Sequence, residues 1–77
     1  MTYAVIDKIK IGQRIARLAS ERGLSLRELE RKSGLTHTAL WQITRGAVLP
    51  RAESLIMFSV IFGVTTDYIL GLSDDSE

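Results

Sequence analysis

Few side chains in this sequence are of the types that carry out catalysis or bind metals. The chain has one histidine, His37, and no cysteine, which excludes thiolate zinc sites, disulfide frameworks and cysteine nucleophiles. The carboxylates are scattered over different segments, so none forms a dyad or triad with the histidine. No glycine-rich phosphate loop is present. We therefore expect that the protein is not an enzyme and uses neither a cofactor nor a metal.

The charged residues are distributed so unevenly that they indicate a polyanionic partner. All ten Lys and Arg residues lie between Lys8 and Arg51, and the first 51 residues contain four carboxylates, which leaves a net charge of +6. Residues 52–77 contain five carboxylates and no Lys or Arg, a net charge of −5. A polyanion would therefore contact the first two-thirds of the chain.

These side chains must be positioned by one small domain, because 77 residues leave no room for a second core. The longest apolar stretch, residues 55–64, is too short to span a bilayer. The beginning of the sequence lacks the basic and long apolar regions of a signal peptide. These features predict a soluble, cytoplasmic protein that does not contact a membrane.

Glycines divide the chain into five helical segments. Five of the six glycines close a run with helical periodicity, and Pro50 forces a loop before the fourth segment. Asp7, Ser25 with Glu28, and Thr36 stand where helix caps are expected. No run alternates with period two, so the predicted class is all-α. The expected helices are residues 8–22, 26–33, 37–45, 52–62 and 66–70, and the expected core is Ile15, Leu18, Leu29, Leu40, Ile43, Leu55, Phe58 and Phe62.

The segment 37–45 places polar and aromatic side chains opposite its apolar ones. Leu40 and Ile43 define the buried direction. The opposite face carries Thr38, Trp41, Gln42 and Arg45. Gln can form two hydrogen bonds to adenine, and Arg can contact guanine or phosphate. On a lone helix such a face is an ordinary solvated surface, but beside a second helix and a tight glycine turn it favours DNA readout.

A family resemblance rests on four blocks of sequence. They are Gly-Leu-Ser-Leu-Arg-Glu-Leu-Glu-Arg-Lys-Ser-Gly-Leu-Thr at 23–36, Arg45-Gly46, Pro50, and Gly-Val-Thr-Thr-Asp-Tyr-Ile-Leu at 63–70. Together they resemble the phage-repressor/Cro type of helix-turn-helix domain, also called the XRE type. The resemblance implies a compact five-helix, lambda-repressor-like fold. It also implies a transcriptional regulator, expected to be a repressor, whose third helix enters the major groove of double-stranded DNA.

The resemblance also implies a domain plan and a set of base contacts. Residues 1–10 are an extension leading into the first helix, 11–72 form the helix-turn-helix domain, and 73–77 are an acidic tail. The expected base contacts are His37, Thr38, Trp41 and Gln42. His37 has a plainer interpretation as a solvated imidazole beside a helix cap. Trp41 either presses on a thymine methyl or a sugar edge, or folds against a neighbouring helix.

Phosphates in this family are bound by backbone amides at the start of the second helix and in the loop after the third. The corresponding phosphate contacts here are Ser25, Leu26, Arg27, Thr36, Arg45 and Arg51. For Arg27 or Arg51 alone, a solvated arginine is an equally good interpretation. Among the positions that depart from the family pattern, Leu26 and Glu30 bear on the interface. Leu26 replaces a Gln that clamps a phosphate. Glu30 replaces a small Ala that packs against the recognition helix, and it fits close helix packing only if its stem lies along the surface with the carboxylate in water.

The segment 52–62 is apolar almost all round, which predicts a contact surface. Its core side is marked by Phe58, so Ile56, Met57 and Val60 lie on the side that faces water. We expect a two-fold homodimer whose interface contains Ile56, Met57, Val60 and Tyr68. Alternatively, a monomer buries this face under residues 3–6.

The rival function is a helical module that binds another protein, such as the antitoxin of a toxin–antitoxin pair or a module coupled to a sensing domain. Antitoxins of this family combine both activities. Binding to DNA that weakens strongly with salt would distinguish a DNA-binding domain from a pure protein-interaction module.

Overall fold

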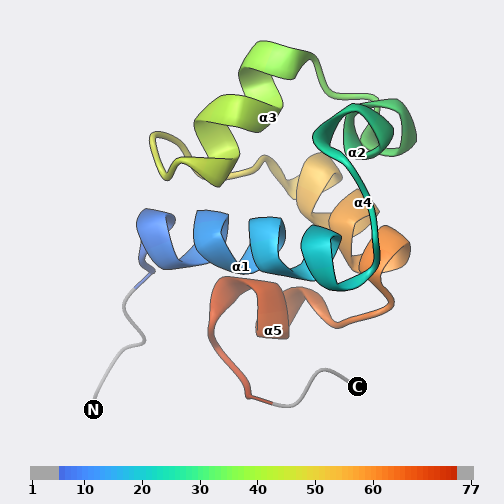
Figure 1. Cartoon of the computed structure of the whole chain (residues 1–77). Coiled ribbons are helices and arrows are strands. Elements are labelled where there is room, and N and C mark those ends of the chain that lie inside the picture. The colour runs from blue at the N-terminus through green and yellow to red at the C-terminus, as the bar shows by residue number, and fades with distance from the viewer. Residues whose placement is uncertain (1–5, 75–77) are drawn as a thin grey trace, which may run out of the picture.

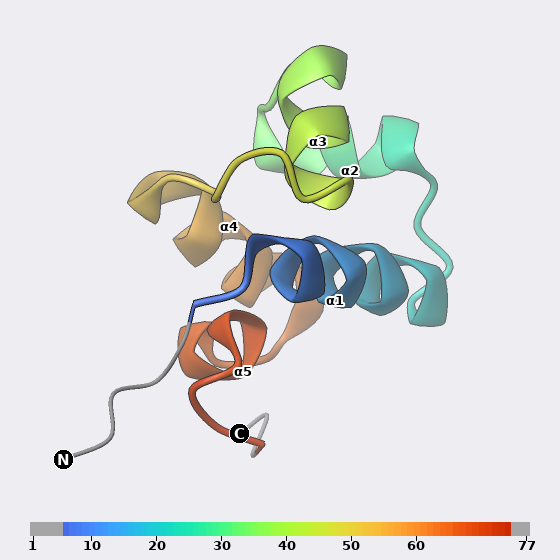
Figure 2. The ribbon, with the colours of Figure 1, turned by 90° about the vertical axis from the view of Figure 1, so that its left-hand side faces the viewer.

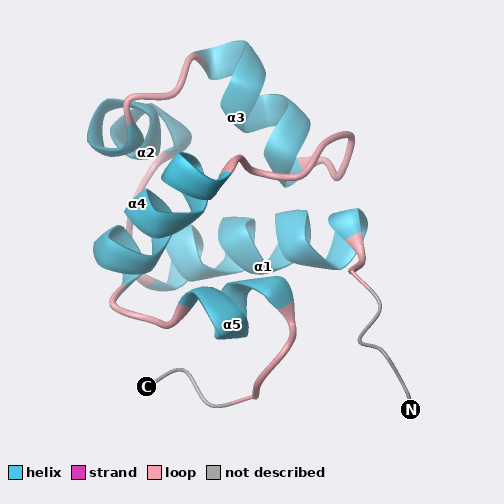
Figure 3. Ribbon diagram, turned by 180° about the vertical axis from the view of Figure 1, so that it is seen from behind, coloured by secondary structure: helices cyan, strands magenta, loops and turns pink. Residues whose placement is uncertain are grey.

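The computed structural model describes residues 6–74, which contain five α-helices and no strand (Figures 1 and 3). The helices are α1 (Lys8–Glu21), α2 (Leu26–Ser33), α3 (His37–Thr44), α4 (Ala52–Phe62) and α5 (Thr66–Leu70). The predicted all-α class and its five segments are confirmed. Two predicted ends differ by one residue, because Arg22 and Arg45 are the C-caps of α1 and α3 rather than their last helical residues.

Side-chain oxygens cap the first turns of the helices where the sequence predicted them. The Asp7 carboxylate accepts hydrogen bonds from the backbone N–H groups of Ile9 and Lys10, at 3.0 and 3.2 Å. Ser25 opens α2 with a complete capping box, and the Thr36 hydroxyl accepts from the third amide of α3. These contacts satisfy amides that have no partner inside the helix, so they fix where each helix begins.

The capping box of α2 also affects the acid–base behaviour of Glu28. Hydrogen bonding from the Ser25 backbone N–H lowers the pKa of Glu28 below its ordinary value of 4.5, and the Ser25 hydroxyl adds a smaller effect in the same direction. A carboxyl group whose pKa is lower in the folded state than in the unfolded state stabilises the folded state at every pH above the unfolded-state pKa. This stabilisation is lost as the pH falls through the folded-state pKa. The cap is therefore intact at neutral pH and weakens in acid.

Helix α1 is the central element of the fold. Helix α3 lies on one side of α1 and α5 on the other (Figures 1 and 2), while α4 packs against α1, α2 and α5. The buried core consists of Ile11, Ile15, Leu18, Ala19, Leu29, Leu40, Ile43, Phe58, Phe62, Val64 and Ile69. All the predicted core residues are in this set except Leu55, which is half-buried and packs against it. The same core therefore holds α2 and α3 in their relative positions.

The crossing of α1 and α3 depends on Gly12, the one glycine that does not end a helix. A Cβ atom at Gly12 would meet the backbone carbonyl oxygens of Ile43 and Thr44, the latter at 2.6 Å. Gly46 makes a second close approach, because a Cβ there would lie 2.8 Å from the Cα of Ile9. The end of α3 thus packs directly against the α1 backbone, and this contact sets the distance between the two helices.

Gly12→Ala is therefore expected to destabilise the fold, although alanine is the better helix former. The gain in helix propensity is about 0.5–1 kcal/mol, whereas forcing extra atoms into a packed contact costs about 1–3 kcal/mol. The atoms that would have to move are backbone carbonyls, so the larger cost should prevail. Urea unfolding of Gly12→Ala beside Gln13→Ala, an exposed neighbour on α1, measures the difference. A Gly12→Ala chain more stable than the wild type would contradict the close packing.

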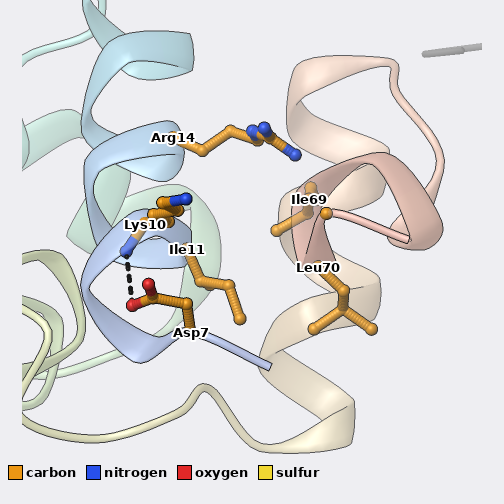
Figure 4. Close-up of a pocket in the computed structure, with 7 residues that line it drawn as sticks. Asp7, Lys10, Ile11, Arg14, Ile69 and Leu70 are labelled. Atoms are coloured by element: carbon orange, nitrogen blue, oxygen red, sulfur yellow. Dashed lines mark hydrogen bonds between the residues drawn. The ribbon is translucent and has the colours of Figure 1, made fainter. Parts of the chain in front are cut away.

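Two arginines of α1 fix the position of α5. Arg14 donates a hydrogen bond to the backbone carbonyl of Tyr68, and its guanidinium carbon lies 5.0 Å from the centroid of the Tyr68 ring. Arg17 donates to the Tyr68 hydroxyl at 2.9 Å. Figure 4 shows Arg14 reaching from α1 toward α5, beside a pocket also lined by Ile69 and Leu70. These contacts anchor α5 to the central helix through Tyr68.

Candidate nucleic-acid interface

The unit formed by α2, the turn at residues 34–36 and α3 has the arrangement of a helix-turn-helix. Gly34 adopts the left-handed conformation, with φ of 76°, and its N–H donates to the Glu30 carbonyl at 2.8 Å. Leu29 of α2 and Leu40 of α3 are both fully buried. The glycine allows the chain to reverse within three residues, and the two leucines fix how the helices pack. The apolar face of α3 is thereby turned inward.

The four predicted base contacts lie on the exposed part of α3. Leu40 and Ile43 are buried against the core, whereas four polar and aromatic residues of the helix face solvent. The exposed residues are His37, Thr38, Trp41 and Gln42. Figure 1 shows α3 at the edge of the molecule, with only its inner side against the other helices. The structure thus brings the four residues together on one accessible surface, which we call the α3 face.

Trp41 on this face is paired with an arginine of its own helix. The Arg45 guanidinium carbon lies 4.4 Å from the centroid of the Trp41 ring, within the range of a cation–π contact. Trp41 keeps 48% of its surface exposed. Their spacing of four residues places them on the same helix face. The contact restrains two large side chains on the α3 face.

Glu30 and His37 form a second contact that the sequence analysis missed. The Glu30 Oε1 atom lies 3.0 Å from the His37 Nδ1 atom. The side chain of His37 is 73% exposed, and that of Glu30 is 20% exposed. Glu30 was expected to hold its carboxylate in water, but the carboxylate instead joins α2 to the first residue of α3. The departure from the family's small alanine is accommodated by this contact.

The predicted phosphate contacts are exposed around the α3 face. A depression lined by Thr36, Gln42 and Arg51 joins the start of α3 to the loop before α4. A second depression joins Ser25 and Leu26 of α2 to the end of α3. The hydroxyls of Ser25 and Thr36 accept hydrogen bonds from amides within their own helix starts. The phosphate candidates Thr36 and Arg51 therefore lie next to Gln42, and those at the start of α2 lie next to Thr44 at the end of α3.

The charge of this region is positive. Arg27, Arg45 and Arg51 are exposed, and within residues 6–74 no carboxylate pairs with any of them. Arg51 is the N-cap residue of α4 but makes no side-chain capping bond there. The three guanidinium groups can therefore offer their hydrogen bonds and charge to phosphate oxygens, which bind arginine well.

The predicted dimer residues fall into two groups. Ile56, Met57 and Val60 are adjacent on the outer side of α4 and are 57%, 38% and 71% exposed; we call them the α4 face. Tyr68 is half-buried, and its ring and hydroxyl are engaged by arginines of α1. The alternative cover for the α4 face, residues 3–6, lies outside the described residues except for Ile6, which is exposed. Within residues 6–74, the α4 face is an exposed apolar surface.

Two kinds of site are absent from residues 6–74. They contain no group of three or more His, Asp or Glu side chains arranged to hold a metal ion. No helix among them has the length and apolarity needed to cross a bilayer.

Comparisons with known proteins agree with this geometry. A helix-turn-helix family model matches residues 13–69. The N-terminal DNA-binding domain of SinR from Bacillus subtilis is 34% identical, over 78% of this chain and 88% of its own, with a TM-score of 0.73. The P22 c2 repressor, in complex with a synthetic operator, is 25% identical over 78% of this chain and 91% of its own, with a TM-score of 0.73.

A third solved structure shares the fold at lower identity. The restriction-modification controller protein C.AhdI from Aeromonas hydrophila is 24% identical, over 82% of this chain and 96% of its own, with a TM-score of 0.75. No curated protein matches the chain significantly.

Proposed function

Because the chain belongs to the XRE-type helix-turn-helix family, we propose that it regulates transcription as a repressor, with α3 in the major groove of its operator. Sequence-specific DNA binding as a transcriptional regulator is the function of the protein. One observation gives the strongest support to the proposal that α3 enters the major groove. His37, Thr38, Trp41 and Gln42 are gathered on the exposed side of α3, beside arginines that form no ion pair with any carboxylate of residues 6–74.

The side chains of the α3 face divide the recognition between them. The Gln42 amide can donate to adenine N7 and accept from its N6 amino group, so it reads one base pair through two hydrogen bonds. Thr38 adds a hydroxyl or methyl contact one turn earlier. Arg27, Arg51 and the amides at the start of α2 bind phosphates, which sets the register of α3 in the groove without reading sequence.

A homodimer through the α4 face would place two copies of α3 on the same side of the DNA. Two-fold related recognition helices about 34 Å apart read half-sites one helical turn apart. The proposed operator is therefore an inverted repeat with half-sites centred about 10 base pairs apart. Such a protein acts in the cytoplasm, where its DNA partner is accessible.

Gln42→Ala is expected to weaken discrimination at one base pair in each half-site. The lost pair of hydrogen bonds is worth about 1–3 kcal/mol of preference for that base pair. Thr38→Ala should have a smaller effect, because a threonine hydroxyl makes one contact. Competition binding with operator variants measures the preference at each position. A set of preferences unchanged by Gln42→Ala would contradict a base contact at this residue.

Arg51→Ala is expected to weaken binding to all sequences alike. A phosphate contact carries no sequence information, and its loss should make the slope of log K against log salt less negative by about 0.9. Arg31→Ala is the matched control, since Arg31 is an exposed arginine of α2 that we do not place at a phosphate. A loss at one base pair only would instead assign Arg51 to base readout.

A second function is favoured by the α4 face, which offers an apolar surface to another protein. An antitoxin-like role would combine operator binding with capture of a toxin, and a sensing domain is another possible partner. A titration with mixed DNA at low salt tests the main proposal against a module that binds only proteins. Strong binding that falls steeply with salt is expected. Binding that is absent or indifferent to salt would leave only the protein-interaction function.

A further inference from the structure

We propose that Glu30 is a positioning residue that fixes the tautomer of His37, so that His37 presents an acceptor nitrogen to the DNA. This inference rests on the proposed function and adds to it the chemical class of base group that His37 would contact. It begins from a side-chain hydrogen bond between α2 and α3, in which Glu30 Oε1 and His37 Nδ1 are 3.0 Å apart.

The proton in this contact belongs to the imidazole. Glutamate carboxyls are ordinarily ionised at neutral pH, and an ionised carboxylate can only accept hydrogen bonds. The Nδ1 atom of His37 must therefore carry the hydrogen. In a neutral imidazole one ring nitrogen is a donor and the other an acceptor. The Nε2 atom is then an unprotonated acceptor.

The exposed ring nitrogen lies on the side of His37 away from Glu30. In an imidazole ring the two nitrogens are separated by one carbon, so their outward directions diverge widely. His37 is 73% exposed, and it is the first residue of α3, next to the cap residue Thr36. With Nδ1 engaged by Glu30, Nε2 is the nitrogen available to a partner at the α3 face.

An acceptor at this position restricts what the neutral His37 can contact. Phosphate oxygens only accept hydrogen bonds, so a neutral Nε2 has nothing to offer them. In the major groove the available donors are the exocyclic amino groups of adenine (N6) and cytosine (N4). The opposite tautomer would instead donate to guanine N7 or O6, to adenine N7 or to thymine O4. Glu30 would therefore decide which of the two classes of base group His37 recognises.

The charges around the pair come from α2 and from the segment after α3. Besides Glu30, α2 contributes Arg27 and Glu28, which precede it, and Arg31 and Lys32, which follow it. Beyond α2, the structure places two arginines beside α3: Arg45, the C-cap residue at its far end, which stacks on Trp41, and Arg51, which lines a depression together with Thr36 and Gln42. Among the contacts of residues 6–74, only Glu30 reaches His37 through a hydrogen bond or ion pair.

The tautomer can be measured in the free protein, because His37 is the only histidine of the chain. A two-bond nitrogen–proton correlation spectrum of the nitrogen-15-labelled, untagged chain at about pH 8, where histidines are ordinarily neutral, separates the two tautomers. The expected result is a protonated Nδ1 in the wild type and a shift toward protonated Nε2 in Glu30→Ala. The control Glu21→Ala removes an exposed carboxylate from α1 and should leave the tautomer unchanged. Wild type and Glu30→Ala with the same tautomer would overturn the proposal.

The contribution to recognition is measured by selecting DNA sites with the same three chains at the same pH. In the wild type, the position contacted by His37 should favour adenine or cytosine. In Glu30→Ala, guanine and thymine, which offer only acceptors, should gain roughly tenfold relative to cytosine, which offers only a donor, a change in the lower part of the range for one base contact. Identical sites for wild type and Glu30→Ala, with the tautomer changed, would overturn the recognition role alone. A wild type that selects no sequence would overturn the proposed function, while the tautomer measured in the free protein would stand.

The comparison requires that the variants fold. Alanine removes only atoms that lie between α2 and α3, and the amide region of a standard correlation spectrum reports whether the fold is kept. Glu30→Gln serves as a size-matched second variant, because its amide oxygen can still accept from Nδ1–H. It should retain the wild-type tautomer in greater proportion than Glu30→Ala. If Glu30→Gln and Glu30→Ala lost the wild-type tautomer to the same extent, the effect would come from the charge of Glu30 rather than from its hydrogen bond. That result would overturn the positioning role.

Discussion

Phe58→Ala should lower the free energy of unfolding by about 3–5 kcal/mol, the usual cost of truncating a buried phenylalanine. Phe58 is fully buried, and its ring stacks on that of Phe62 with the centroids 5.9 Å apart. It lies on α4, which packs against α1, α2 and α5. A domain of this size has a total stability of only about 4–12 kcal/mol. The variant should therefore be partly or wholly unfolded near room temperature.

Val60→Ala is the matched control for this prediction. It truncates another apolar residue of α4, but Val60 is 71% exposed, so no cavity forms and the change in stability should be small. Denaturant unfolding followed by circular dichroism measures both variants. If Phe58→Ala lost no more stability than Val60→Ala, the core described here would be wrong.

Met57→Lys combined with Val60→Lys is expected to give a folded monomer that binds its operator roughly 100-fold more weakly. Lysines on the α4 face would place like charges opposite each other across a two-fold interface. Their stems remain in water on the monomer, so the fold should persist. A monomer engages one half-site at a time and loses the gain that linkage of two sites provides, which is commonly 100-fold or more.

The control for the lysine pair separates dimerisation from charge. Gln13→Lys with Ser20→Lys adds the same charge at exposed positions of α1, and any direct electrostatic effect should strengthen binding rather than weaken it. Sedimentation at tens of micromolar gives the oligomeric state, and titration of operator DNA gives the affinity. A double variant that remains dimeric, or a wild type that is already monomeric, would remove the α4 face from the proposed interface.

Helix starts and ends could be predicted from the sequence because short-range chemistry determines them. Asp7, Ser25 and Thr36 are followed at the right spacing by amides that need acceptors, and each caps its helix as predicted. Glycines at five predicted helix ends adopt positive φ. The apolar stripes gave the core for the same reason, since periodicity alone decides which side of a helix can be buried.

Contacts between segments could not be predicted in the same way. From the sequence alone, Gly12 is a glycine that weakens the helix in which it lies. Only the close crossing of α3 shows why a side chain cannot be placed there. Glu30 was predicted to hold its carboxylate in water, because nothing in the sequence places His37, seven residues later, within hydrogen-bonding distance. The arginines that hold Tyr68 are more than 50 residues from it in sequence. Such pairs depend on packing, which a one-dimensional pattern does not contain.

Selection of bound fragments from genomic DNA tests the central claim most directly, because it examines specificity and symmetry together. Wild type and Gln42→Ala, both at moderate salt, should be compared. We predict that the wild type enriches an inverted repeat with half-sites about 10 base pairs apart. Gln42→Ala should enrich the same repeat with one relaxed position in each half. Fragments with no common sequence, or an identical motif for both chains, would contradict the account of α3 as the helix that reads the operator.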